Sequence, residues 1–235
     1  VVGRRPTTTR SLRRLSMQSS NLDPLPDGGD PIQAGSSDAA KPLKMPMIWI
    51  DCEMTGLDIE SDTILEIAVV MTDSDLNRVI EGPDLVIHHS DKVLNAMGEW
   101  CITHHGESGL TDKVRASTLT MTAAEDEIMS FVTKWATKPG QTPLAGNTVH
   151  CDRMFLKKFM PRLDQYMHYR IIDVSSFKEI CRRWNPGVFS RAPKKALLHR
   201  ALDDIRESIE ELKYYKAHLL VVKTKKDPKT KSQPK

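Results

Sequence analysis

Short apolar runs recur along this 235-residue chain at spacings that predict strands. The run MIWI is typical of a buried strand, and TILEIAVVM of a second one. The next apolar segment is broken near Gly82 and Pro83, because both residues interrupt regular strands. The five expected strands cover residues 47–50, 63–71, 77–89, 143–146 and 170–174.

Segments in which apolar residues recur at helical spacing lie between and after these strands. The four expected helices cover residues 122–137, 151–159, 177–184 and 201–220. Thr120 or Thr122 is suited to cap the first of them. The last helix is expected to place four apolar side chains on one side: Ile205, Ile209, Leu212 and Tyr215. Three strands followed by mixed helices and strands predict an α/β sheet with both faces partly covered.

Composition fits one sizeable α/β domain, since 39% of residues are hydrophobic and 28% charged. It excludes a fibre and a mostly disordered chain. The net charge of +3 points toward nucleic acid, but its distribution does not. Residues 1–42 hold six basic and four acidic side chains, and residues 223–235 hold six Lys and one Asp. The intervening segment has 22 basic and 26 acidic residues, so global charge predicts no large nucleic-acid footprint.

The ends of the chain differ in composition from its centre. Residues 1–22 contain five Arg, several Ser and Thr, and no acid, as in an organellar transit-type leader. The alternative is a disordered leader with no targeting function. We expect a linker over 23–44, the folded domain over 45–222 and a Lys-rich tail over 223–235. A mitochondrial location is expected, with cytoplasm or nucleus as alternatives. The four cysteines form no CxxC pair, and no apolar run is long enough to span a membrane.

Two carboxylates end the first expected strand, in the segment IWIDCEMTG. Asp51 and Glu53 are two positions apart, so a strand places both on one face and Cys52 on the other. Adjacent carboxylates repel each other, and a bound Mg²⁺ or Mn²⁺ would remove that cost. The alternative is two solvated acids at a strand end.

Further acids occur where later helices begin. Asp152 follows the segment PLAGNTVHC, and Asp203 and Asp204 come shortly after His199. An acid in a first helical turn is often only a favourable partner of the helix dipole. The order is more specific than any single residue: two strand acids, one acid midway, and then a His followed by an Asp.

Four longer strings carry a resemblance to a known family: IWIDCEMTGLD, GNTVHCDRMFLKKFMP, YRIIDVSSFKEI and HRALDDIRESIEELKYY. They resemble the oligoribonucleases of the DEDDh 3′-to-5′ exonuclease family, over residues 46–218. The resemblance implies a ribonuclease-H-like fold, with a mixed sheet of about five strands flanked by helices. It also implies hydrolysis of very short RNA, down to 5′-phosphorylated dinucleotides, to 5′-mononucleotides.

The family motifs match this sequence one position at a time. The first, D-x-E, falls on Asp51 and Glu53, and the second acid falls on Asp152. The third, H-x-A-x-x-D, gives His199 and Asp204, although ideal helix spacing would place Asp203 on the same face as the His. The resemblance implies that the four carboxylates hold two divalent ions, Mg²⁺ or Mn²⁺. It makes His199 the general base that takes a proton from the attacking water.

The resemblance also implies how a short substrate is held. Leu57 matches a residue that wedges between the two bases, Trp100 one that stacks beside a base, and Thr148 one near the 5′-phosphate. A second group matches residues that cap the 5′ end across a homodimer interface: Tyr169, Arg170 and Ser175. The alternatives are a broader DEDDh exonuclease that trims tRNA 3′ ends or single-stranded DNA, and a catalytically silent RNA-binding module.

Overall fold

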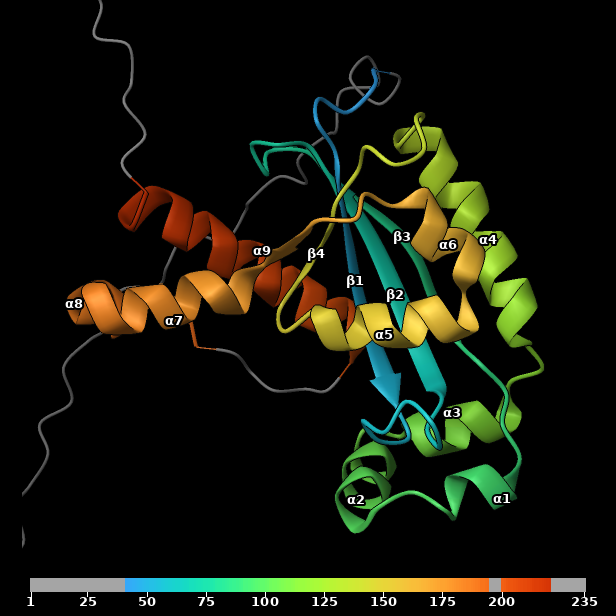
Figure 1. Cartoon of the computed structure of the whole chain (residues 1–235). Coiled ribbons are helices and arrows are strands. Elements are labelled where there is room, and N and C mark those ends of the chain that lie inside the picture. The colour runs from blue at the N-terminus through green and yellow to red at the C-terminus, as the bar shows by residue number, and fades with distance from the viewer. Residues whose placement is uncertain (1–40, 195–199, 221–235) are drawn as a thin grey trace, which may run out of the picture. The chain divides into compact units, whose positions relative to one another are not determined.

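A five-stranded mixed sheet forms the centre of the computed structural model, which describes residues 41–194 and 200–220 (Figure 1). The strands are β1 (Met47–Met54), β2 (Ile64–Thr72), β3 (Val79–Val86), β4 (Leu144–Gly146) and β5 (Ile171–Asp173). The helices are α1 (Asp91–Leu94), α2 (Glu99–Glu107), α3 (Leu110–Ala116), α4 (Met121–Trp135), α5 (His150–Phe159), α6 (Pro161–Tyr166), α7 (Val174–Trp184), α8 (Pro186–Phe189) and α9 (Ala201–His218). The expected α/β class and mixed sheet of five strands are confirmed.

Strand β1 lies in the middle of the order β3-β2-β1-β4-β5. It is antiparallel to β2 and parallel to β4, and β4 is parallel to β5. The carboxyl ends of β1, β4 and β5 therefore share one edge of the sheet. In Figure 1 the tip of β1 points toward α1, α2 and α3 at that edge.

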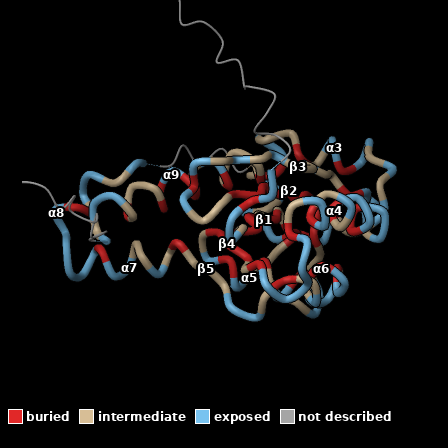
Figure 2. The backbone as a smooth tube through the Cα atoms, turned by 90° about the horizontal axis from the view of Figure 1, so that it is seen from above, coloured by how far each residue is buried: buried red, intermediate tan, exposed pale blue. Residues whose placement is uncertain are grey.

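Alternation along β1 divides the apolar core between the two faces of the sheet. Ile48, Ile50 and Cys52 pack with the cluster that contains α4, α5 and α6. Met47 and Trp49 pack with the cluster that contains α7, α8 and α9. Figure 2 shows the buried positions concentrated where helices and strands meet. The next side chains on the face of Trp49 are Asp51 and Glu53, so the strand's period of two directs both acids toward α9.

The third strand differs from its prediction. A break was expected near Gly82 and Pro83, but β3 runs through both. The pairing with β2 shifts there, because Ala68 is opposite Asp84 while Val70 is opposite Glu81, so β3 carries one extra residue. β3 is an edge strand, where a proline can lack its N–H. A Cβ on Gly82 would lie 2.3 Å from the Phe131 ring, so this bulge needs glycine.

The four expected helices are present, and Thr120 caps α4 by accepting a hydrogen bond from the Ala123 N–H at 3.2 Å. The four apolar side chains predicted on one side of α9 are all buried. Five further helices were not predicted, namely α1, α2, α3, α6 and α8. The first three lie on a small apolar cluster of their own: Leu65, Leu94, Met97, Leu110 and Val114.

Packing begins slightly before the expected start of the domain, since Leu43 is buried in the core. The expected leader over 1–22, most of the expected linker and the tail over 223–235 lie outside the described residues, as does His199. Among the described residues, no helix is both long and apolar enough to cross a membrane.

Candidate active site

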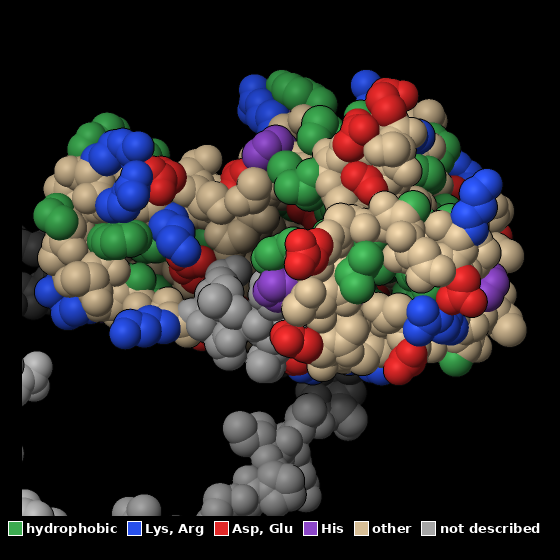
Figure 3. Space-filling model, turned by 90° about the horizontal axis from the view of Figure 1, so that it is seen from below, with side chains coloured by type: hydrophobic (Ala, Val, Ile, Leu, Met, Phe, Trp, Pro, Cys, Tyr) green, Lys and Arg blue, Asp and Glu red, His purple; other side chains and the backbone are tan. Residues whose placement is uncertain are grey.

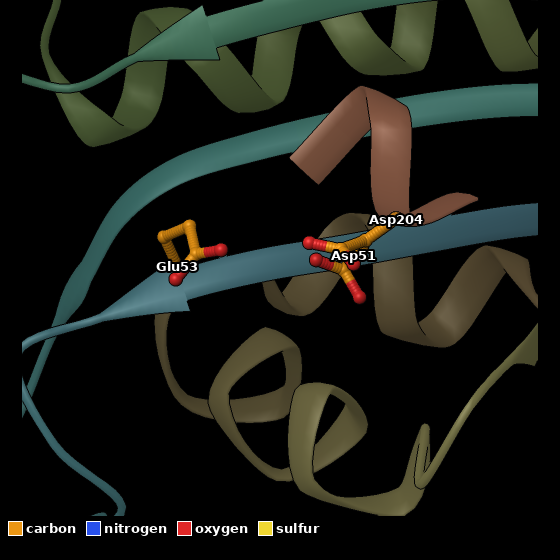
Figure 4. A group of neighbouring side chains, drawn as sticks. All are labelled: Asp51, Glu53 and Asp204. Carbon is orange, nitrogen blue, oxygen red and sulfur yellow. The ribbon is translucent and has the colours of Figure 1, made fainter. Parts of the chain in front are cut away.

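Three carboxylates meet at the carboxyl end of β1. Asp51 and Glu53 come from β1, and Asp204 comes from the first turn of α9, which packs on that face of the sheet. One oxygen from each residue lies within 4.8 Å of the other two. Figure 4 shows the Asp51 and Asp204 carboxylates beside each other, with Glu53 further along the strand. Cys52 points away into the core, as predicted.

The structure brings Asp204 to this cluster, and Asp203 to a different one. The Asp203 carboxylate accepts a hydrogen bond from Arg206 at 2.7 Å, and Arg206 also pairs with Glu81 on β3. Asp203 is therefore held on the outer side of α9. Ideal helix spacing favoured Asp203, but the structure places Asp204, the acid matched by the family motif, beside Asp51 and Glu53.

Glu53 is in an unfavourable place for a negative charge. Burial raises its pKa to about 7, and the nearby charges of Asp204, Glu66 and Asp152 act in the same direction. His105 on α2 donates a hydrogen bond from its Nε2–H to the Met54 carbonyl oxygen at 2.9 Å, and its Nδ1 lies 3.9 Å from Glu53 Oε2. His105 thus supports the end of β1 structurally.

Asp152 lies in the first turn of α5 and is buried. Its Oδ1 accepts a hydrogen bond from the Cys52 N–H at 3.0 Å, which fixes the carboxylate against β1 between Asp51 and Glu53. Burial raises the pKa of Asp152 to about 7. Asp152 does not belong to the group of three whose oxygens all lie within 4.8 Å, but its charge acts on Glu53.

This donor set fits a hard divalent cation. The oxygens of three carboxylates converge, and burial together with mutual repulsion raises the pKa of at least one of them. A cation would remove that repulsion, and carboxylate oxygens are the ligands that Mg²⁺ and Mn²⁺ prefer.

Leu57 is presented by a well-ordered turn after β1. Its side chain is 71% exposed, which is unusual for leucine. The turn is closed by Asp62, which accepts hydrogen bonds from the Thr55 hydroxyl at 2.7 Å and from the Asp58 N–H at 2.9 Å. A Cβ on Gly56 would lie 2.4 Å from the Asp62 carboxylate, so only glycine allows this approach.

Trp100 lies on α2, at the same edge of the sheet as Leu57. Its side chain is largely exposed and stacks on His104, with ring centroids 3.9 Å apart. The exposed part of the indole presents aromatic surface to solvent at this end of the strands.

Thr148 and Ser175 come together although 27 residues separate them. Their hydroxyl oxygens lie 3.0 Å apart. The Thr148 N–H donates to Ser175 Oγ at 2.9 Å and to Asp173 Oδ1 at 3.0 Å. Thr148 has a φ of 53°, a left-handed conformation that a β-branched residue rarely adopts. Such strain is typical of functional positions.

Tyr169 and Arg170 lie at the opposite end of the strands from the carboxylates. In the register, Ile171 is level with Leu144 and Ile48, so Arg170 is level with Met47. Asp51 is four residues further along β1, about 13 Å along the strands and about 10 Å across them. The Tyr169 ring is 73% exposed, stacks on His168 and lies 5.3 Å from the Arg170 guanidinium carbon. A hollow of about 760 Å³ lies at the same edge, lined in part by Pro46, Thr142 and His168.

The sequence contains a further residue beside the site to which no role was given. Glu66 on β2 is opposite Glu53 in the register and is fully buried. Its Oε1 accepts a hydrogen bond from Arg200 at 2.9 Å, and Oε2 lies 3.5 Å from the Ala201 N. A charged residue inside the apolar run ILEIAVV was the only available signal, because its partner is 134 residues away.

Comparisons with known proteins agree with this geometry. A model of the RNase_T family, described as "Exonuclease", matches residues 48–212. A Bos taurus protein named "Oligoribonuclease, mitochondrial" is 53% identical over 198 residues, covering 84% of this chain and 81% of that protein. A "Probable oligoribonuclease" from Dictyostelium discoideum is 58% identical over 170 residues, 72% of this chain and 88% of that protein.

A solved structure supports the fold alone. The zinc-bound complex of E. coli ExoI with ssDNA superimposes with a TM-score of 0.56 at 19% identity, over 74% of this chain. The match spans 41% of the length of that protein.

Proposed function

This chain belongs to the oligoribonuclease family of DEDDh exonucleases, which makes it a hydrolase, and from that premise we propose that it degrades very short RNA from the 3′ end. The products would be 5′-mononucleotides, and 5′-phosphorylated dinucleotides the characteristic substrate. The observation that carries the proposal is the group of three converging carboxylates at the carboxyl end of β1.

The proposed chemistry needs positive charge where phosphodiester cleavage builds up negative charge. Two divalent ions, Mg²⁺ or Mn²⁺, supply that charge to the attacking and leaving oxygens when they are bound. Asp51, Glu53 and Asp204 would hold them, supported by the convergence of their oxygens. Asp152 would complete the set through Oδ2, because its Oδ1 is engaged by the Cys52 N–H.

His199 is proposed as the general base. It lies outside the described residues, and the proposal rests on the sequence motif and on its neighbour Arg200, which occupies the N-cap position of α9 and accepts a hydrogen bond from the Asp204 N–H through its carbonyl oxygen. Imidazole has an ordinary pKa near 6.5, so it can take the proton of the attacking water at neutral pH.

The proposed substrate contacts divide between the two edges of the sheet. Leu57 and Trp100 would hold the bases, supported by their exposure, and Thr148 would hold the 5′-phosphate. Ser175 was expected to act across the interface with Tyr169 and Arg170, but its hydroxyl oxygen lies 3.0 Å from that of Thr148 in the same chain, so we assign it to the 5′-phosphate beside Thr148. Arg170 is too far along the sheet to reach the carboxylates of its own chain, since the register places it level with Met47.

We therefore propose a homodimer in which Tyr169 and Arg170 reach the site of the second copy. Exposed apolar side chains on α7 support an interface, since Trp184 is 77% and Ile180 37% exposed. Figure 3 shows hydrophobic side chains beside Lys and Arg on the lobe formed by α7 and α8.

The deciding experiment compares hydrolysis of a 5′-phosphorylated diribonucleotide with that of a long single strand at equal enzyme concentration. We expect the dinucleotide to be cleaved faster, with activity abolished by a chelator and restored by Mn²⁺. A faster rate on the long strand would favour a broader exonuclease. Absence of cleavage with Mn²⁺ present would favour an RNA-binding module.

A mitochondrial location is also proposed. Residues 1–22 have the composition of a transit-type leader, and the Bos taurus relative is named mitochondrial. Imaging the chain with and without residues 1–22 tests this, because equal distributions would contradict it.

A further inference from the structure

A buried carboxylate lies behind the proposed 5′-phosphate site. Glu211 on α9 is only 3% exposed, and burial of an ionised carboxylate is unfavourable unless partners compensate it. Its partners are the Tyr215 hydroxyl, which donates to Oε1 at 3.1 Å, the Lys178 ammonium 3.5 Å from Oε1, and Asn147 Nδ2, which donates to Oε2 at 3.2 Å. The carboxylate therefore joins α9 and α7 to the loop between β4 and α5.

Glu211 fixes the orientation of the Asn147 amide. An ionised carboxylate only accepts hydrogen bonds, so the amide nitrogen must face it. The same nitrogen donates to Ser208 Oγ at 2.8 Å. The amide oxygen consequently faces the other way, where it accepts a hydrogen bond from the Ser175 hydroxyl at 3.0 Å.

The direction of that hydrogen bond determines how the two hydroxyls are arranged. Because the Ser175 hydroxyl donates its hydrogen bond to the Asn147 amide oxygen, the Ser175 oxygen can only accept from the Thr148 N–H and from the Thr148 hydroxyl. The Thr148 N–H is fixed by two acceptors, which holds the residue at its left-handed φ of 53°. The Thr148 hydroxyl proton can turn to an arriving phosphate while the backbone remains anchored.

We propose that Glu211 and Asn147 are positioning residues for recognition of the substrate's 5′-phosphate, acting through Ser175 on Thr148. This rests on the proposed function, which places the 5′ end of the substrate at Thr148 and Ser175. A neutral amide at position 211 can donate as well as accept. It would therefore allow Asn147 to turn over and present its nitrogen to Ser175, which removes the fixed direction of the chain of hydrogen bonds.

The test uses the full chain and two dinucleotides of the same sequence, one with a 5′-phosphate and one with a 5′-hydroxyl. The readout is the ratio of their kcat/KM values. In Glu211→Gln we expect this ratio to fall about tenfold, the effect of one hydrogen bond to a charged group, with the loss in KM for the phosphorylated dinucleotide. Thr148→Ala should show the same selective loss, and combining the two changes should add little because they act on one interaction.

Glu210→Gln is the matched control, since Glu210 is the adjacent acid on the exposed side of α9 and pairs with Lys213 at 2.6 Å. It should keep the wild-type ratio. Should Glu211→Gln unfold at the assay temperature, Ser208→Ala is the milder variant. It removes the second acceptor of the Asn147 amide and should lower the ratio about threefold.

Three contrary results can be told apart. If the wild type prefers the 5′-phosphate and Thr148→Ala loses that preference, but folded Glu211→Gln and Ser208→Ala keep it, the positioning role is wrong and the proposed function stands. An equal loss on both dinucleotides would also overturn the positioning role. If the wild type shows no preference for the 5′-phosphate, the assignment of the 5′ end to Thr148 fails, and the inference fails with it.

Discussion

Removing Arg200 should destabilise the protein by an amount that depends on pH. Glu66 is fully buried in the sheet, and the Arg200 guanidinium 2.9 Å from its Oε1 is its ion-pair partner. Breaking a buried pair by removing one member leaves an uncompensated charge. Arg200→Met keeps most of the side-chain stem and removes the charge, so the variant isolates the electrostatic part.

In this variant the Glu66 carboxylate can take up a proton, which limits the loss in free energy of unfolding. Burial already raises the pKa of Glu66 above its ordinary value near 4.5, while Arg200 opposes this rise, so the variant should raise the pKa further. Protonation at pH 7 costs about 3 kcal/mol, since each pH unit above the ordinary pKa costs about 1.4 kcal/mol. The folded state then binds a proton that the unfolded state lacks, so stability falls as pH rises above about 4.5 and the deficit almost disappears near pH 5.

Urea unfolding of the wild type and the Arg200→Met variant, both in the presence of a chelator, at pH 5, 6 and 7 measures the loss in free energy of unfolding. We expect a deficit of at most about 3 kcal/mol at pH 7, smaller at pH 6 and smallest at pH 5. The double variant Glu66→Gln/Arg200→Met should recover most of the loss, because replacing both members of a buried pair is often nearly neutral. A deficit that is equal at all three pH values, or absence of recovery in the double variant, would refute the reasoning.

Three further predictions concern the proposed active site. Asp204→Asn should lower kcat at least 100-fold while Asp203→Asn stays within about threefold, because Asp204 joins the carboxylate cluster and Asp203 pairs with Arg206; reversed effects in the dinucleotide assay would contradict this. Burial raises the pKa of Glu53 and Asp152 to about 7, so both groups bind protons more tightly in the folded state, and the metal-free protein should lose stability as pH rises from 5 to 8. The increase in Tm on adding saturating Mn²⁺ should therefore be roughly 5 °C larger at pH 8 than at pH 5. An increase in Tm that is the same at both pH values would contradict this. Leu57→Ala should raise KM for dinucleotides about tenfold by removing an apolar contact with the bases, and an unchanged KM would show that the exposed side chain contacts no base.

Local patterns were sufficient for the parts of the site that depend on short-range periodicity. The period of two in β1 predicted that Asp51 and Glu53 share a face and that Cys52 is buried on the other. The helical period predicted the buried side of α9. The selection of Asp204 over Asp203 came from the resemblance to a family, because ideal helix spacing favoured the other residue.

Long-range contacts could not be read from the sequence in the same way. The Glu66–Arg200 and Asn147–Glu211 contacts join residues that are 134 and 64 positions apart, and no local pattern pairs them. Helices α1 and α3 have four and seven residues, too few to be stable by propensity alone, and they depend on packing with Leu65 of β2. The strand break predicted at Pro83 was wrong because an edge strand with a bulge tolerates proline.

The distribution of charge around the carboxylates bears on the proposed preference for a short substrate. Parallel β1, β4 and β5 direct their carboxyl ends to one edge, so acids accumulate there, and the segment between the basic ends of the chain holds more acidic than basic residues. A long polyanion would be repelled along such a surface, whereas a dinucleotide needs few phosphate contacts. Arg170 precedes β5 at the opposite end of the strands from Asp51 by the register, which agrees with the proposed homodimer in which it acts at the site of the second copy. The proposed preference for short RNA thus agrees with the acidic balance of the segment that carries the carboxylate cluster.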